Sequence, residues 1–121
     1  MGLFDDVKEK FYDLEDGRYL VRIEGFYREK TKNGLRPIRW DLVLINDVKG
    51  ALPTKFSHIE TDGGFRILMN EIKRLGYEKP KSPRELEAVL NDLCGSYVEI
   101  SLFTTDFQEG YREVRFLRKM G

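Results

Sequence analysis

The chain has 121 residues, of which 21 are basic and 21 are acidic, so its formal net charge is zero. This length predicts one domain over residues 1–121, and a hydrophobic content of 40% supports one core and excludes a disordered chain. Zero net charge excludes a uniformly basic domain, so any nucleic-acid site must come from charge segregation along the chain.

The first 16 residues predict a short N-terminal helix. Apolar residues recur in it at helical spacing, at Leu3, Phe4, Val7, Phe11 and Leu14. The Asp16-Gly17 pair ends the segment. These 16 residues hold six acidic and two basic side chains, which makes this start of the chain acidic.

Three β-strands are predicted after this helix. Residues 19–27 alternate between apolar and polar, and Gly25 indicates a bulge or bend because glycine has no side chain to pack there. The Asn33-Gly34 pair tolerates positive φ at both centres of a tight turn and predicts a hairpin. The second strand covers residues 38–45, and a third, weaker strand covers residues 52–59.

The apolar period then changes to 3.6 residues, which predicts two helices within residues 62–94. Asp62 is the expected N-cap of the first helix, and Gly76 follows its end. Its apolar face is made of Phe65, Leu68, Met69, Ile72 and Leu75. Ser82 and Glu85 form a capping box for the second helix, which carries Pro83 at its first position and ends before Gly95.

Two further strands close the chain, one around residues 98–102 and one over residues 111–117, joined by a turn at 106–110. The element order is therefore one helix, three strands, two helices and two strands. This order predicts a mainly β fold with helices: a five-stranded OB-fold, a Greek-key barrel, with a helical insertion between strands 3 and 4 and a short N-terminal helix. An α+β sandwich is the structural alternative.

No motif for an enzyme, a metal site or a membrane span is present in the sequence. It lacks a phosphate-binding loop, a His-Glu-x-x-His motif and a Gly-x-Ser-x-Gly elbow, so no enzymatic activity is expected. Cys94 and His58 are single residues of their kind and cannot form a closed zinc site, so neither a metal nor a cofactor is expected. We expect Cys94 to be a buried structural thiol. The absence of a signal peptide or an apolar span predicts a cytoplasmic protein.

The remaining signal is a basic segment interleaved with aromatic residues. Residues 17–45 hold seven basic and three acidic side chains. Single-stranded nucleic acid needs cations that follow the phosphates and aromatic faces that stack on the bases. In an OB-fold these would come from strands 2 and 3 and from the loops that join strands 1–2 and 4–5. The candidate phosphate contacts are Arg28, Lys30, Lys32, Arg36, Arg39, Lys55 and Arg112.

The candidate stacking residues are Tyr27, Trp40, Phe56 and Tyr111, with Phe107 in the second loop. Trp40 has two open interpretations. It shares strand parity with Leu42 and Leu44, which favours the core, and base stacking is the alternative.

Several of these segments together resemble a family of small bacteriophage proteins that are similar to single-stranded-DNA-binding proteins. The resemblance spans roughly residues 15–104 and rests on Gly17-x-Tyr19-x-Val21-x-Ile23, Lys30-Thr31-Lys32-Asn33-Gly34, the run from Trp40 to Asn46, Leu75-Gly76 and the run from Leu93 to Ile100. It implies an OB-fold with a helical insertion and DNA binding without sequence preference. The basic end, Arg118-Lys119-Met120-Gly121, departs from the acidic tail that many single-stranded-DNA-binding proteins carry.

The sequence thus predicts a non-enzymatic single-stranded-DNA-binding protein of phage or mobile-element replication or recombination. Single-stranded DNA is the expected ligand, and no membrane is expected as a partner. Replication or recombination proteins and a second copy of the chain are the protein partners that this role allows. The alternative is a protein-interaction or assembly module built on the same barrel.

Overall fold

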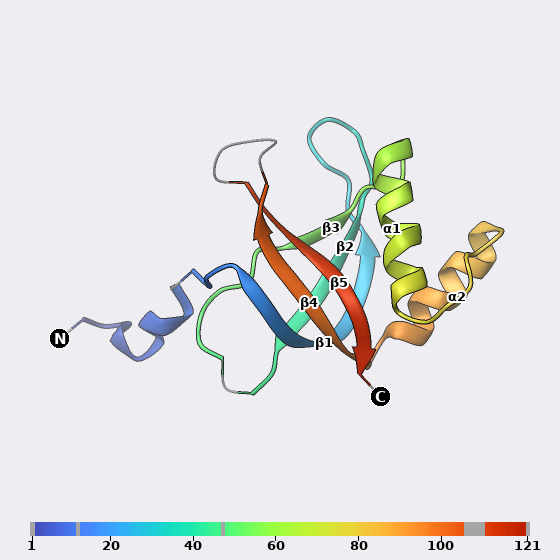
Figure 1. The fold of residues 1–121 in the computed structure, drawn as a ribbon. Coiled ribbons are helices and arrows are strands. Elements are labelled where there is room, and N and C mark those ends of the chain that lie inside the picture. The colour runs from blue at the N-terminus through green and yellow to red at the C-terminus, as the bar shows by residue number, and fades with distance from the viewer. Residues whose placement is uncertain (1, 12, 47, 106–110, 121) are drawn as a thin grey trace.

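The chain folds into a five-stranded antiparallel sheet that curls into a half-barrel, with two α-helices on one side of it (Figure 1). The structure is a computed structural model that describes residues 2–11, 13–46, 48–105 and 111–120. The sheet order is β3-β2-β1-β4-β5. In chain order the elements are β1 (Gly17–Arg28), β2 (Ile38–Leu44), β3 (Lys55–Ser57), α1 (Asp62–Arg74), α2 (Pro83–Leu93), β4 (Tyr97–Thr104) and β5 (Arg112–Met120). The predicted mainly β architecture with helices is confirmed.

Strand alternation builds the core on the inner face of the half-barrel, as period-2 patterning requires. Val21 and Ile23 of β1 are fully buried there. The register between β1 and β2 shifts between Ile23 and Gly25, so the predicted bulge at Gly25 is confirmed. The bulge changes which residues face inward, because one extra residue reverses the strand's parity. As a result Phe26 lies against the core, and Tyr27 lies on the outer face, with 42% of its surface exposed.

Trp40 belongs to the core and is 3% exposed. Its indole ring meets the Phe116 ring edge-on at a centroid distance of 5.0 Å. Its Nε1–H donates a hydrogen bond to Ser57 Oγ at 2.9 Å, which satisfies the indole's only donor. The core interpretation of Trp40 is therefore confirmed, and its place among the stacking candidates is wrong because no face of the ring is open to a base.

The two α-helices begin at the caps that the local sequence provides. Thr61 is the N-cap of α1, and its hydroxyl accepts a hydrogen bond from Gly64 N–H at 3.1 Å. The predicted cap, Asp62, is instead the first residue of the helix. A Cβ on Gly64 would lie 1.9 Å from the backbone oxygen of His58, so this turn requires glycine.

The capping box of α2 is present, but one of its two hydrogen bonds involves the backbone of the preceding residue. Ser82 Oγ accepts from Glu85 N–H at 3.1 Å, as predicted. The Glu85 carboxylate accepts from the backbone N–H of Lys81 at 2.9 Å, and not from that of Ser82. Leu90 and Leu93 bury the inner side of this helix against the core.

Three predicted elements differ from the structure. The N-terminal segment forms only a 3₁₀ helix, η1 (Asp5–Phe11), and of its apolar residues only Leu14 joins the core. The third strand is three residues long, because it pairs only with Ile38–Trp40 of β2 and follows Pro53, which has no N–H to donate. In the loop over residues 29–37, Gly34 N–H donates to Thr31 O at 3.0 Å, so Gly34 is the last residue of the turn and not a central one.

The two edges of the half-barrel, β3 and β5, are not paired with each other in the described residues. Side chains bridge the seam between them. Lys55 of β3 donates from Nζ to Val114 O of β5 at 2.7 Å and forms a buried ion pair with Glu71 of α1 at 2.8 Å. Glu71 Oε2 accepts from Phe116 N–H of β5 at 2.7 Å. Arg74, one turn further along α1, donates from Nε to Phe116 O at 3.1 Å.

We expect Lys55→Met and Glu71→Leu each to lower the free energy of unfolding by about 3–5 kcal/mol, because each change leaves the other charge buried without its partner. The double variant should cost less than the sum of the two. Urea denaturation monitored by circular dichroism measures the free energy of unfolding of the three variants. Arg118→Met is the control, since its pair with Glu99 lies at the surface and should contribute less than about 1 kcal/mol. Additive effects of the two core changes would contradict this account.

Candidate nucleic-acid interface

A row of three outward side chains crosses β1, β2 and β3. Tyr27 of β1 is the register partner of Arg39 of β2, and Arg39 is the register partner of Phe56 of β3. Tyr27 and Phe56 are 42% and 38% exposed. The Arg39 guanidinium lies 5.7 Å from the centre of the Tyr27 ring. We call these three residues the Tyr27–Arg39–Phe56 row.

The guanidinium of Arg39 is held in place by one carboxylate. Nη1 donates to Glu29 Oε2 at 3.2 Å, and this hydrogen bond raises the pKa of Arg39. The Nε of Arg39 is buried without a hydrogen-bond partner in the described part of the chain. Arg39 therefore has a donor left over, and its partner Glu29 stands at the start of a solvent-exposed loop.

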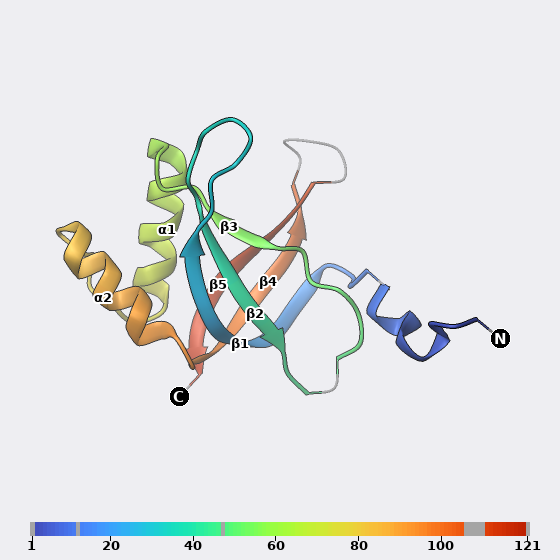
Figure 2. The ribbon, with the colours of Figure 1, turned by 180° about the vertical axis from the view of Figure 1, so that it is seen from behind.

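That loop, residues 29–37, is fixed at its base and carries two exposed cations further along. The Arg28 guanidinium donates to Arg36 O and pairs with Glu60 at 3.1 Å. Glu60 also accepts from the backbone N–H of Arg36. Lys30 and Lys32 are exposed beyond this base. The loop extends from one end of the half-barrel, beside β3 and the start of α1 (Figure 2).

The structure removes Lys55 from the predicted phosphate contacts. Its side chain is buried in the seam, where Nζ also lies 4.6 Å from the centre of the Phe116 ring. Burial lowers the pKa of Lys55, and the charge of Glu71 opposes that shift. The alternation of β3 is the cause: Lys55 and Ser57 face inward, and Phe56 between them faces outward.

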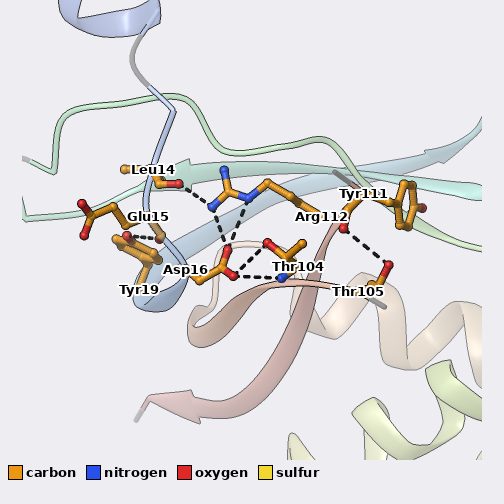
Figure 3. A network of polar contacts seen from close by, with 8 residues as sticks. All are labelled: Leu14, Glu15, Asp16, Tyr19, Thr104, Thr105, Tyr111 and Arg112. Carbon is orange, nitrogen blue, oxygen red and sulfur yellow. Dashed lines mark hydrogen bonds and ion pairs between the residues drawn. The ribbon is translucent and has the colours of Figure 1, made fainter. Parts of the chain in front are cut away.

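Arg112 is also engaged, as Figure 3 shows. Its guanidinium pairs with Asp16 at 2.9 Å and donates to the backbone oxygen of Leu14. Asp16 accepts in addition from the backbone N–H and the hydroxyl of Thr104, at 3.0 and 2.9 Å. This cluster ties the start of β1 to β4 and β5, so Arg112 has a structural contact that the sequence did not predict.

Tyr111 lies next to this cluster with an exposed ring. In Figure 3 the ring points away from the Asp16–Arg112 pair. Tyr111 and Phe56 both line a small hollow of about 60 Å³ at the seam between β3 and β5. Tyr111 and Phe56 therefore lie beside the same stretch of the seam. Phe107 and the predicted turn at 106–110 lie outside the described residues.

No arrangement typical of a metal site is found in the part of the chain that the structure describes. No group of three His, Cys, Asp or Glu side chains there is placed to hold a metal ion. Cys94 is exposed, so its predicted burial is wrong: it is the C-cap of α2 and lies beyond the helix's apolar side. Partial desolvation raises the pKa of its thiol, which disfavours the nucleophilic thiolate. Among the described helices, none is both long enough and apolar enough to cross a membrane.

The structure thus brings together Tyr27, Arg39 and Phe56 on one outer face, with Tyr111 beside the seam hollow that Phe56 also lines. Lys30 and Lys32 are exposed in the loop that follows β1. The structure places Trp40 and Lys55 inside the fold and engages Arg28 and Arg112 in ion pairs. The sequence patterns did not predict the roles of Glu29 and Glu60, the carboxylates that pair with Arg39 and Arg28. These two ion pairs depend on strand register and on loop length, and a local sequence motif reveals neither of those.

Neither a protein-family model nor a curated protein sequence matches this chain. The resemblance to small phage proteins that are similar to single-stranded-DNA-binding proteins therefore stays a prediction.

The Asp16 cluster predicts a pH dependence of stability. Hydrogen bonds from Arg112 and then Thr104 hold the pKa of Asp16 below its ordinary value of 3.8. A carboxylate whose pKa is lowered by folding adds stability above its unfolded-state pKa and loses it as the pH falls through the folded-state pKa. Asp16→Asn should therefore be less stable than wild type at pH 7, and the difference should shrink as the pH falls below 3.8.

Thermal or urea unfolding at a series of pH values measures this difference. Glu87→Gln, which removes an exposed carboxylate of α2, is the control and should show no such trend. A gap between Asp16→Asn and wild type that stays constant down to pH 2 would mean that the charge of Asp16 does not stabilise the fold.

Proposed function

We propose that this chain binds single-stranded DNA without sequence preference, through the outer face of β1, β2 and β3 and the loop over residues 29–37. The observation that carries the proposal is the Tyr27–Arg39–Phe56 row, in which two half-exposed aromatic rings flank a guanidinium on adjacent strands. Bases stack on aromatic faces, and a cation between them is placed for the phosphate that joins two bases.

We also propose that the half-barrel is an OB-fold. The strand order supports this, because β1 is central and pairs with both β2 and β4, which leaves β3 and β5 as the two edges that meet across the seam. The pair of helices lies between β3 and β4 in the chain. In OB-folds the face of strands 2 and 3, with the loops on either side, binds oligonucleotides. The Tyr27–Arg39–Phe56 row lies on that face.

Binding would proceed by exchange of acidic side chains for phosphates. Arg39 is paired with Glu29 in the free protein, so an incoming phosphate replaces a carboxylate at the same guanidinium. Both side chains of this pair are partly exposed, at 37% and 38%, so a phosphate can reach the guanidinium from solvent. Lys30 and Lys32 are exposed and supply cations that a phosphate reaches without displacing a partner.

A role in phage or mobile-element replication or recombination, in the cytoplasm of a bacterial host, fits this binding mode. Such a protein needs no catalytic group, metal or cofactor of its own. Replication or recombination proteins are its proposed protein partners. A protein-interaction module on the same barrel remains the competing function, and it predicts no salt-sensitive binding of an oligonucleotide.

The first test measures the affinity for a short labelled oligonucleotide against salt concentration. Each phosphate contact that is lost should flatten the slope of log K against log[salt] by about 0.7. Lys30→Ala with Lys32→Ala should therefore weaken binding and reduce the slope by about 1.4. Arg39→Gln should also weaken binding.

Arg84→Ala with Arg118→Ala is the matched control, because it removes two exposed positive charges of α2 and β5, away from the loop over residues 29–37. It should leave the slope unchanged. Equal effects of the two double variants would attribute binding to net charge and not to the loop. A wild-type protein that binds no oligonucleotide at low salt would reject the proposed function.

The second test separates stacking from electrostatics. Tyr27→Leu and Phe56→Leu keep the charge of the face, and each should lower the binding free energy by about 1–3 kcal/mol with the salt slope unchanged. Tyr97→Leu, at a comparably exposed tyrosine of β4, is the control and should have no effect. Fluorescence of Trp40, the single tryptophan, should respond weakly to DNA because the indole is buried. If only the Tyr97 variant lost binding, DNA would bind at β4, and the proposed site on β1, β2 and β3 would be wrong.

A further inference from the structure

Residues 2–11 form an arm with three large apolar side chains that lie exposed on the described part of the chain. Leu3, Phe4 and Phe11 are 85%, 70% and 77% exposed. The chain is anchored only after this arm, where Leu14 is buried and Asp16 pairs with Arg112. Both ribbon views show the arm projecting from the half-barrel on the side away from α1 and α2 (Figures 1 and 2).

The arm has a defined shape in spite of this exposure. Asp5 accepts a hydrogen bond from the backbone N–H of Gly2 at 2.8 Å, which closes a turn around Leu3 and Phe4. The 3₁₀ helix η1 follows directly. The turn therefore presents two large apolar side chains next to the carboxylates of Asp5 and Asp6. Large apolar groups clustered at the surface mark an interaction site.

A groove with complementary properties lies on the opposite side of the molecule. It runs along α1 and the segment 77–83 and consists of two adjoining hollows of about 790 and 700 Å³, which share Ile59, Phe65, Met69 and Lys79 in their walls. Phe65 was predicted to be a core residue of α1, but it is 39% exposed and stands between the two hollows. Helix packing within this chain therefore leaves the outer end of the apolar face of α1 uncovered.

The rim of the groove is basic. Its walls hold five basic and three acidic side chains. One of the acidic residues, Glu60, is paired with Arg28, and another, Asp62, stands in the first turn of α1, where the helix dipole favours a negative charge. Arg66, Lys73 and Lys79 are exposed along α1 and the following segment. The charge of the rim is thus opposite to that of Asp5 and Asp6.

We propose that the N-terminal arm of one copy of this chain docks into the α1 groove of a second copy. Leu3 and Phe4 would pack against Phe65, Met69 and Ile59, and the two carboxylates would face Arg66 and Lys73. The occupant is a second copy because the arm starts on the far side of its own half-barrel from the groove. The inference goes beyond the proposed DNA binding and does not depend on it.

This contact is heterologous, since it joins two different surfaces, so it leaves a free arm and a free groove at the two ends of any dimer. Copies can then add head to tail. An arm of about ten residues buries less than the roughly 1,600 Å² of a standard interface, so we expect weak, concentration-dependent association.

Analytical ultracentrifugation of the full chain without nucleic acid, over about 1 to 500 µM, tests the proposal. The average mass of the wild type should rise with concentration. Leu3→Ser with Phe4→Ser in the arm, and Phe65→Ser in the groove, should each weaken association by roughly tenfold or more. All these side chains are partly or fully exposed, and circular dichroism verifies that both variants remain folded. Val43→Ser, at a comparably exposed apolar residue of β2 outside the groove, is the matched control.

Mixing the two variants gives the decisive measurement. The arm variant keeps an intact groove, and the groove variant keeps an intact arm, so an equimolar mixture should form a one-to-one dimer that does not grow further. The proposal is overturned if the wild type stays monomeric throughout the range, or if either variant associates as well as the wild type. A mixture that stays monomeric, or a Val43→Ser variant as defective as Phe65→Ser, would overturn it as well.

Discussion

The buried ion pair between Lys55 and Glu71 is the interaction that closes this fold. A sheet edge leaves backbone groups that must find partners, and for β5 those partners are side chains. Val114 O accepts from Lys55, Phe116 N–H donates to Glu71, and Phe116 O accepts from Arg74. These contacts replace the ladder that β3, with only three residues, does not form with β5. They also fix α1 over the seam, so one pair of charges positions a strand, a helix and the edge of the sheet together.

The bulge in β1 determines which side chains are available for binding. Before the bulge, odd-numbered residues such as Val21 and Ile23 face the core, and an unbroken strand would bury Tyr27 with them. The extra residue between Ile23 and Gly25 reverses the parity, so that Phe26 fills the core and Tyr27 joins Arg39 and Phe56 outside. The inward side chains on either side of Phe56 are Lys55 and Ser57, which hold the seam and the Trp40 indole. The proposed Tyr27–Arg39–Phe56 row therefore depends on the bulge in β1 and on the inward position of Lys55 and Ser57 in β3.

Much of the architecture could be predicted from the sequence, because strand alternation, the 3.6-residue period and the cap at Ser82 are local signals. The structure agrees at the five strands, the two helices, the bulge at Gly25 and the core position of Trp40. Errors arose where the outcome depends on distant residues. The sequence predicted Lys55 to be a surface cation, but it is buried and contacts Glu71 and Val114. It predicted Arg112 to contact phosphate, but Arg112 is paired with Asp16. The N-terminal apolar pattern is helical in period, but no surface of the described residues covers Leu3, Phe4 and Phe11, and the segment forms only a short 3₁₀ helix.

The two proposed surfaces are adjacent through a single ion pair. Arg28 lines one hollow of the α1 groove, and its partner Glu60 lines the other. The same two side chains bind the backbone of Arg36 at the base of the loop that carries Lys30 and Lys32. An arm seated in the groove would therefore lie next to the ion pair that supports the loop. If the seated arm changes the affinity of the loop for DNA, DNA on the loop must change the affinity of the groove for the arm by the same factor, because coupling between two binding events is reciprocal. A chain of zero net charge can thus link self-association to DNA binding without a separate regulatory element.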